Sequence, residues 1–259
     1  MSKYPIGIFD SGVGGTSIWK AITALLPNEN TIYLADSKHA PYGAKGKDRI
    51  TELSIKNTEL LLENDCKLIV VACNTATTNA IKTLRETFSV PFIGIEPAIK
   101  PAALQTATKA VGILATKGTL SSELFSKTSQ LFANGIQIIE QIGDGIVPLI
   151  ENGKLQSAEM KSLLELYLQP MLEASIDYLV LGCSHYPYLT PMLLELLPEH
   201  VKIIDSGEAV ARQTKSVLEQ HGLLNTDYLK PQLKFYSNSN TEVMQELIGK
   251  DYEVKYLDF

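Results

Sequence analysis

Cysteine is scarce in this chain, and no hydrophobic run is long. The three cysteines, Cys66, Cys73 and Cys183, form no C-x-x-C pair and no zinc spacing, which excludes a disulfide scaffold or a zinc-ribbon protein. An odd, sparse set is typical of reduced thiols, so we expect a cytoplasmic protein. No apolar run approaches the roughly 20 residues of a membrane span, and the first residues lack the apolar region of a signal peptide. We therefore expect no membrane partner.

Basic stripes and cofactor motifs are also missing. The 259 residues carry a formal net charge of −6, which argues against nucleic acid as a partner. The glycine-rich turn at residues 10–17 lacks the Gly-Lys-Ser/Thr ending of a phosphate-binding loop, and Ser17 replaces the third glycine of a dinucleotide fingerprint. We also see no plausible metal cluster. The pattern alone leaves a pyridoxal-phosphate lysine open.

That turn nevertheless follows an apolar strand and precedes a helix, so its backbone N–H groups can hold a small anion such as a carboxylate. Asp10, which opens the turn, suits a ligand that carries an ammonium group. The simpler reading is a tight turn with Asp10 as a helix cap.

Cys73 ends a second buried strand, residues 68–72. Small polar residues follow it, and a helix is expected to begin near Thr77. A cysteine at the carboxyl end of a strand and the amino end of a helix lies where α/β sheets bind ligands. Such a position favours a thiolate. The alternative is a buried, inert thiol.

The same pattern recurs at residues 179–185, where a strand, a small residue and Cys183 are followed by Ser184 and His185. Thr116, which ends an earlier strand, precedes Cys183 by 67 residues, much as Asp10 precedes Cys73 by 63. This spacing indicates two similar units whose thiols face each other across a crevice. Two opposed bases are what inversion at a carbon atom requires, because one removes a proton and the other returns it on the opposite face.

The order of elements predicts an α/β fold with mostly parallel sheets. Strands are expected at residues 6–9, 31–35, 68–72, 90–95, 110–115, 136–139, 179–182, 201–204, 232–236 and 253–257. Helices are expected between them, including residues 50–64, 157–169, 209–219 and 241–248. We expect two similar α/β domains with an active site in the cleft between them.

Five segments together resemble the glutamate racemase family of the Asp/Glu racemase superfamily: residues 9–15, 41–43, 72–75, 148–151 and 182–187. The resemblance implies a discontinuous first domain, residues 1–98 plus 208–259, and a second domain, residues 99–207. It further implies cofactor-independent racemisation of glutamate, a role in supplying D-glutamate for bacterial peptidoglycan, and a homodimer.

The resemblance also assigns roles to residues. Cys73 would act on D-glutamate and Cys183 on L-glutamate, while Asp10 and His185 flank the thiols and assist proton transfer. Glu151, matched through Pro-Leu-Ile-Glu, is the family's additional acid, although a solvated acid at a helix start is an alternative. The substrate contacts implied are Asp10, Ser11, Pro41, Tyr42, Gly43, Asn74, Thr75, Thr116, Ser184 and His185. Ser184 departs from the family's usual threonine, and Cys66 is read as a packing residue.

Two alternatives stay open at this point. The substrate could be aspartate or another small amino acid of the same superfamily. A protein of another class could use the cleft for binding alone or act on a larger partner, although a binder has no need of two opposed thiols.

Overall fold

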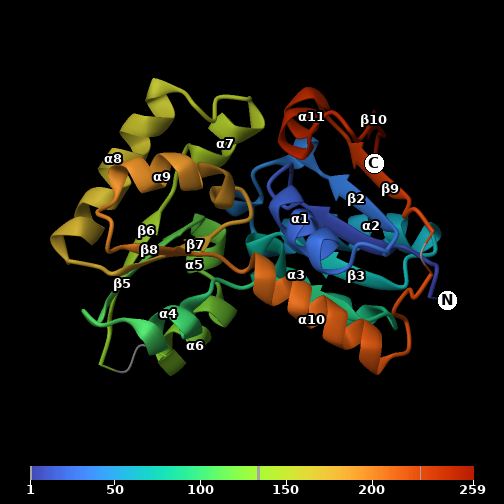
Figure 1. Cartoon of the computed structure of the whole chain (residues 1–259), viewed down its shortest axis with the longest axis horizontal. Helices are drawn as coiled ribbons and strands as arrows, with labels where there is room; N and C mark the ends of the chain where they lie inside the picture. Colours follow the sequence, from blue (N-terminus) through green and yellow to red (C-terminus); the bar gives the residue numbers. More distant parts are fainter. Residues whose placement is uncertain (1, 133–134, 228) are drawn as a thin grey trace.

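The computed structural model describes residues 2–132, 135–227 and 229–259, which form two parallel β-sheets flanked by helices (Figure 1). The first sheet has the order β10-β9-β2-β1-β3-β4, and the second has the order β6-β5-β7-β8. All the pairings within both sheets are parallel. The strands are β1 Ile6–Asp10, β2 Thr31–Ala35, β3 Leu68–Val71, β4 Phe92–Gly94, β5 Ala110–Ala115, β6 Gln137–Ile142, β7 Tyr178–Gly182, β8 Lys202–Ile204, β9 Leu233–Ser237 and β10 Val254–Tyr256.

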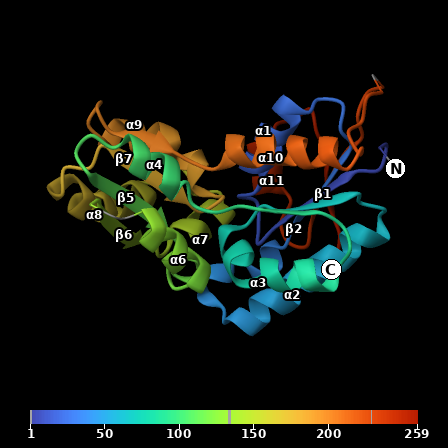
Figure 2. The same cartoon turned by 90° about the horizontal axis from the view of Figure 1, so that it is seen from below.

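Helices cover both faces of each sheet. Around the first sheet lie α1 Thr16–Leu25, α2 Lys47–Glu63, α3 Asn74–Thr87, α10 Gly207–Gln220 and α11 Glu242–Ile248. Figure 2 shows α1 and α10 on one side of β1 and β2, with α2 and α3 on the other. Around the second sheet lie α4 Ile99–Gln105, α5 Lys117–Leu120, α6 Glu123–Phe132, α7 Ile146–Glu151, α8 Ala158–Glu173 and α9 Thr190–Leu196. Within the ranges that the structure describes, three short 3₁₀ helices occur in connections: η1 Ser37–His39, η2 Tyr42–Ala44 and η3 Tyr186–Leu189.

The central strands are buried on both faces, which explains why their sequences are nearly continuous apolar runs. Every residue of β1, β2, β3, β5 and β7 is buried, as expected for parallel strands covered by helices on two sides. The predicted α/β fold with parallel sheets is therefore confirmed. No helix within the described residues is both long and apolar enough to cross a bilayer.

The tail of the chain returns to the first sheet. Strand β9 pairs with β2, and β10 pairs with β9. Phe235 of β9 packs edge-on against Trp19 of α1, with ring centroids 4.7 Å apart, a favourable aromatic geometry. This membership of the strands supports the proposed domains, residues 1–98 plus 208–259 and residues 99–207. Their boundaries remain a proposal.

One local expectation was wrong. Helix α3 begins at Asn74 and not near Thr77, because Cys73 itself is the N-cap and its sulfur accepts the Ala76 N–H at 3.4 Å. Residues 146–151 form α7, a short helix that the sequence analysis did not predict. Pro148 is tolerated there because it lies in the first turn, where its missing N–H has no partner to lose.

Candidate active site

The carboxyl ends of strands from both sheets converge on one small cavity. Its lining comprises Ser11, Pro41, Tyr42, Gly43, Cys73, Asn74, Thr75, Thr116, Val147, Cys183, Ser184 and His185. All the residues that the sequence indicated are in this lining except Asp10 and Glu151, which lie behind it. Val147 is the one lining residue that the sequence did not indicate. Two parallel sheets thus bring segments more than 100 residues apart together at one point, as expected for α/β proteins.

Cys73 lies at the end of β3 and caps α3. It is buried, its thiol contacts Ser11 Oγ at 3.6 Å, and it accepts the Ala76 N–H. Burial and the nearby Asp10 carboxyl raise the pKa of Cys73 well above its usual range, and the helix N–H only partly opposes them. The expected preference for a thiolate at a helix start is therefore not what this state of the protein shows, because burial outweighs the helix terminus.

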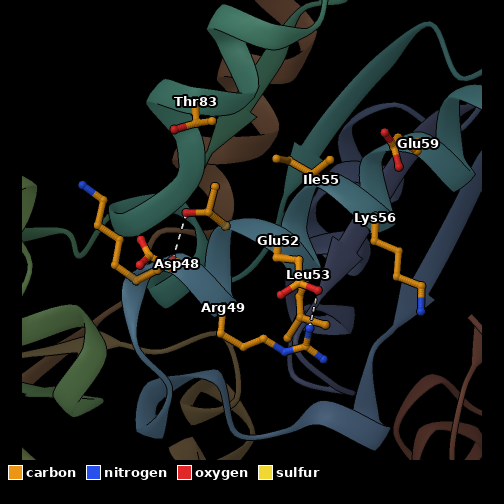
Figure 3. Close-up of a pocket in the computed structure, with 10 residues that line it drawn as sticks. Asp48, Arg49, Glu52, Leu53, Ile55, Lys56, Glu59 and Thr83 are labelled. Atoms are coloured by element: carbon orange, nitrogen blue, oxygen red, sulfur yellow. Dashed lines mark hydrogen bonds and ion pairs between the residues drawn. The ribbon is translucent and has the colours of Figure 1, made fainter.

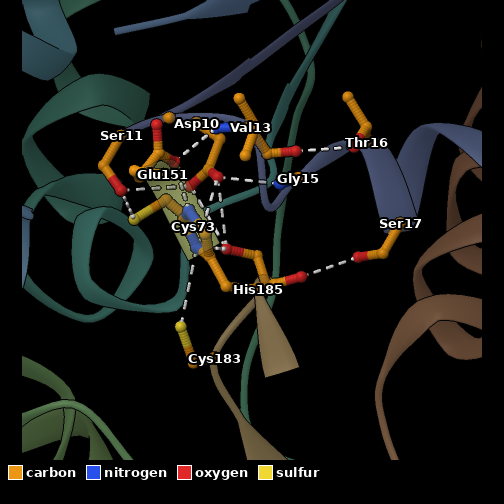
Figure 4. Close-up of polar contacts among 12 residues, drawn as sticks. Asp10, Ser11, Val13, Gly15, Thr16, Ser17, Cys73, Glu151, Cys183 and His185 are labelled. Atoms are coloured by element: carbon orange, nitrogen blue, oxygen red, sulfur yellow. Dashed lines mark hydrogen bonds and ion pairs between the residues drawn. The ribbon is translucent and has the colours of Figure 1, made fainter. Parts of the chain in front are cut away.

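Cys183 has a different environment. Strand β7 is followed by Ser184, His185 and the short η3 helix, so that Cys183 does not cap an α-helix as Cys73 does. Its sulfur lies 3.8 Å from Nδ1 of His185 (Figure 4). The two thiols therefore have unlike neighbours, a carboxyl group beside Cys73 and an imidazole beside Cys183.

His185, which contacts Cys183, forms a buried ion pair with Glu151. The distance from His185 Nε2 to Glu151 Oε1 is 2.5 Å. Burial lowers the pKa of His185, but hydrogen bonds to Cys183 and Glu151 and the nearby carboxyl charges outweigh it, so that the pKa is raised well above the usual range. Burial similarly opposes ionisation of Glu151, yet its contacts with His185, Val13 and Ser37 hold its pKa below the usual value. Both shifts favour the charged forms of the pair.

The glycine-rich turn is already occupied by carboxylates of the protein. Glu151 accepts the Val13 N–H at 2.7 Å, and Asp10 accepts the Gly15 N–H at 2.7 Å. The N–H groups of this turn do bind carboxyl groups, as the sequence predicted. These carboxyl groups belong to Glu151 and Asp10 of the protein itself and not to a ligand. Glu151 also accepts a hydrogen bond from Ser37 at 2.8 Å, so it is neither solvated nor at a helix start.

Asp10 is fully buried, and its carboxyl group contacts Ser11 and the Gly15 N–H (Figure 4). Ser184 Oγ lies 3.3 Å from each of its carboxyl oxygens, and His185 Nδ1 lies 3.9 Å from Oδ2. Burial is the main reason that its pKa is raised, although His185 and the Gly15 N–H oppose that effect. A carboxyl group whose pKa is shifted by burial and by a neighbouring charged residue is typical of functional sites.

Asn74 provides the clearest sign of a missing polar partner. Both polar atoms of its buried amide lack a hydrogen-bond partner among the described residues. An unpaired buried polar group costs about 1–3 kcal/mol, and such groups are rare in native proteins. Because Asn74 lines the cavity, a polar ligand there would satisfy it.

The cavity is closed. Its volume is about 10 Å³, enough for about one water molecule. In its lining, Thr75 Oγ1 of the first unit lies 2.8 Å from Thr116 Oγ1 of the second. Gly43 packs so tightly against Thr116 that an added β-carbon would lie 2.9 Å from Thr116 Cβ. A ligand of amino-acid size therefore enters only if these two segments separate.

Larger hollows elsewhere lack reactive groups. Figure 3 shows a groove of about 820 Å³ along α2, lined largely by charged side chains such as Arg49 and Glu52, which form an ion pair at 2.6 Å. This is a solvated helix surface without thiol or histidine. Among the residues that the structure describes, no cluster of three or more His, Cys, Asp or Glu is arranged to hold a metal ion.

Residues 11–214 match the model of the Asp/Glu/hydantoin racemase family. The chain belongs to this family. It is 45% identical over 248 residues to a glutamate racemase of Ectopseudomonas mendocina, with 95% of this chain and 94% of that one covered. It is 46% identical over 225 residues to a glutamate racemase of Herpetosiphon aurantiacus, covering 87% and 89%.

Solved structures of the family agree. The glutamate racemase of Escherichia coli in complex with L-glutamate and an activator superposes with a TM-score of 0.86 at 35% identity, covering 97% of this chain and 96% of that one. A glutamate racemase of Bacillus anthracis superposes with a TM-score of 0.87 at 28% identity, covering 99% and 97%. An aspartate racemase of Picrophilus torridus shares the fold, with a TM-score of 0.57 at 18% identity, covering 84% and 94%.

Sequence reasoning missed the supports of the site. Glu151 is held by Ser37 and by the Val13 N–H, and Tyr42 is held by Asp36. None of these three supporting residues carries a motif that distinguishes it from an ordinary loop residue. One signal existed for Asp36, because it directly follows β2, the strand next to β1. Polar residues after adjacent parallel strands meet at one sheet edge.

Proposed function

We propose that this chain interconverts L-glutamate and D-glutamate without a cofactor, using Cys73 and Cys183 as the two acid/base groups. The observation that carries the proposal is that both thiols line one cavity from equivalent strand ends of two similar units. Family membership and the glutamate racemases among the relatives support the choice of reaction.

In the proposed reaction, the thiolate of one cysteine takes the α-proton of glutamate and becomes a thiol. The electron pair of the C–H bond remains on the α-carbon. The thiol of the other cysteine then donates its proton to the opposite face and becomes a thiolate. The configuration is inverted, no redox change occurs, and the two cysteines have exchanged protonation states. Carried over from the family, Cys73 would take the proton of D-glutamate and Cys183 that of L-glutamate.

The unlike surroundings of the thiols support this division of work. His185, held by Glu151, lies with its Nδ1 3.8 Å from the sulfur of Cys183, so an imidazole lies within reach of this thiol. Burial and the nearby Asp10 carboxyl raise the pKa of the Cys73 thiol, which favours its protonated form in the closed cavity. Asp10 and His185 would adjust their own protonation as charge moves between the two sides.

Substrate binding would use the remaining polar groups of the cavity. The amide of Asn74, which has no partner in the closed cavity, is suited to a carboxylate. The hydroxyls of Ser11, Thr75, Thr116 and Ser184 can add hydrogen bonds, and Pro41, Tyr42 and Gly43 would form the wall of the loop. Preorganised donors of this kind stabilise the charge that builds up when the α-proton leaves.

Two wider roles follow from the family resemblance. D-glutamate made by this reaction would supply peptidoglycan synthesis, and the protein would act as a homodimer. Racemisation of aspartate is the alternative, but the likeness to an aspartate racemase, at 18% identity, is an argument for the fold alone.

Circular dichroism tests the proposal. Dialysed, chelator-treated protein should abolish the signal of L-glutamate and of D-glutamate, each reaching zero, and leave L-aspartate unchanged. Activity that vanishes on dialysis and returns only with an added cofactor would contradict a cofactor-free mechanism. Rapid loss of the aspartate signal, with glutamate unchanged, would instead favour the alternative substrate.

A further inference from the structure

The returning tail places an asparagine beside the site. Asn238 directly follows β9, as Asp36 follows β2 and Asp10 ends β1. Strands β9 and β2 pair in parallel with Ala35 opposite Ser237. Backbone hydrogen bonds hold these strand ends side by side, because Asp36 N–H donates to Asp10 O at 3.0 Å and Asn238 N–H donates to Ala35 O at 3.3 Å. A residue near the end of the chain therefore lies at the sheet edge that carries the catalytic groups.

The side chain of Asn238 is buried, and both its amide nitrogen and its amide oxygen are hydrogen-bonded. Its Nδ2 donates to Asp36 Oδ1 at 2.6 Å and to the Phe259 carbonyl at 3.1 Å, while its Oδ1 accepts the Lys38 N–H at 2.9 Å. This pattern requires an amide. A carboxylate at the same position could still accept from Lys38, but it would place a second anion against Asp36.

Asp36 in turn holds Tyr42. The Tyr42 hydroxyl donates to Asp36 Oδ2 at 2.5 Å and accepts from Asn57 Nδ2 at 3.1 Å. Asp36 and Tyr42 are both 1% exposed. His39 Nδ1 lies 2.6 Å from Asp36 Oδ1. A buried carboxylate keeps its place only while such donors surround it, so the loss of the Asn238 donor would loosen the position of Asp36.

Tyr42 donates its single hydroxyl proton to Asp36, so it has no further proton to donate to a substrate. What the loop offers to the cavity is the ring of Tyr42 and the backbone on either side of it, at Pro41 and Gly43. The location of these groups depends on where Asp36 anchors the ring. The Tyr42 ring thus forms part of the cavity wall, and its position is set by the hydrogen bond to Asp36.

We propose that Asn238 is a positioning residue for substrate binding, acting through Asp36 on the Pro41–Gly43 wall of the cavity. The inference rests on the proposed racemisation of glutamate. Asn238 touches no reacting atom, so its removal should weaken the binding of substrate and transition state alike. Such a change raises KM and leaves kcat nearly unchanged.

The test compares three variants by steady-state kinetics with each enantiomer and by thermal unfolding. Asn238→Asp should raise KM about tenfold for both enantiomers while kcat stays within about twofold. The loss of kcat/KM must be the same for L-glutamate and D-glutamate. The two enantiomers have the same free energy, so the equilibrium constant of racemisation is unity in every variant and fixes the ratio of the two kcat/KM values. The swapped double variant Asp36→Asn/Asn238→Asp restores one donor opposite one acceptor and should recover most of the parent KM.

The matched control is Asn225→Asp, at the other end of the same tail. Its Nδ2 donates to the Asn28 carbonyl at 2.8 Å, and its N–H donates to Glu29 Oε1 at 2.7 Å. This change weakens the attachment of the tail without touching Asp36, so KM should stay within about twofold of the parent.

Each failure has a distinct meaning. A folded Asn238→Asp protein with the parent KM, a swapped variant without recovery, or an equal rise of KM in Asn225→Asp would overturn the positioning role. A parent protein that racemises neither enantiomer would instead overturn the proposed function.

Discussion

Gly14 of the glycine-rich turn faces His185 so closely that a β-carbon on Gly14 would lie 2.2 Å from Nδ1 and 2.6 Å from the backbone nitrogen of His185. Gly14 follows β1 of the first sheet and His185 follows β7 of the second, so this contact limits how near the two units can approach. Glycine suits position 14 because a side chain there would meet the ring and the backbone nitrogen of His185. The neighbouring Gly12 has the same relation to Glu151, with Oε1 at 2.0 Å.

Gly14→Ala should therefore prevent the closed arrangement and misplace His185 beside Cys183. A displacement of about 1 Å at a reacting group costs on the order of 100-fold in rate, so we expect kcat/KM to fall by at least about that factor. Gly46→Ala is the control, because nothing lies within 4 Å of its added β-carbon. Parent-like kinetics for Gly14→Ala would show that the contact does not govern catalysis.

Asn74→Leu separates stability from activity. Leucine has a similar shape and removes two buried polar atoms that have no partner within the described part of the chain, so the midpoint of thermal unfolding should stay the same or rise, by roughly 2–4 °C per kcal/mol gained. The loss of a hydrogen bond to a substrate carboxylate, worth about 1.5–3 kcal/mol, should lower kcat/KM about 10- to 100-fold. In the control Asn79→Leu, the midpoint should fall, because that amide donates to Thr75 O and Gly118 O. A large drop in the Asn74→Leu midpoint would refute the idea of an unsatisfied group waiting for substrate.

Glu151→Gln should lower the pKa of His185. Burial already lowers that pKa, and the hydrogen bond and charge of Glu151 are among the causes that raise it. In the parent, the raised pKa means that the His185 contribution to stability is full below about pH 6.5 and is lost as pH rises through the folded value. The pKa of Glu151 is lower in the folded state than in the unfolded state, so Glu151 stabilises the fold at pH values above its unfolded pKa. This stabilisation is lost as the pH falls through the folded pKa.

Titration of the histidine ring signals by NMR checks this expectation. The His185 signal should titrate at lower pH in Glu151→Gln, while the exposed His200 and His221 serve as internal controls. An unchanged His185 titration would mean that Glu151 does not set its charge.

The division of labour between the thiols is tested with a β-chloro analogue of glutamate. When a base takes the α-proton of this analogue, chloride leaves with the electrons of its C–Cl bond and no second base is needed. Serine is a far weaker base than cysteine. Cys73→Ser should therefore release chloride from the L analogue only, and Cys183→Ser from the D analogue only. The same preference in both variants, or glutamate racemisation at the parent rate in either, would rule out the two-thiol mechanism.

Alkylation by iodoacetamide should distinguish the three cysteines. Burial raises the pKa of Cys66 to about 12, and Cys66 does not line the cavity, so it should react slowest. Cys73 and Cys183 become accessible when the cavity opens, and glutamate should protect both. Peptide mapping that finds Cys66 labelled first, with no protection elsewhere, would contradict the assigned site.

Strand order along the chain, the paired cysteine segments and most of the cavity lining could be read from the sequence. Continuous apolar runs that end in small polar residues predict parallel strands buried on two faces, and polar residues at strand ends predict a ligand edge. Cys73, Cys183, Asn74 and Thr116 all line the cavity for that reason. These are local signals, and they survive without knowledge of the fold.

Only the tertiary structure decided how these groups are charged and supported. Cys73 lies at a helix start, a position that by itself lowers the pKa of a thiol, yet burial and the Asp10 carboxyl raise the pKa of Cys73. Glu151 reaches the Val13 N–H across 138 residues of sequence, and Asn238 reaches Asp36 across 202. Burial, electrostatic interaction and hydrogen bonding depend on distances in space between segments remote in sequence, so no local pattern of residues could reveal them.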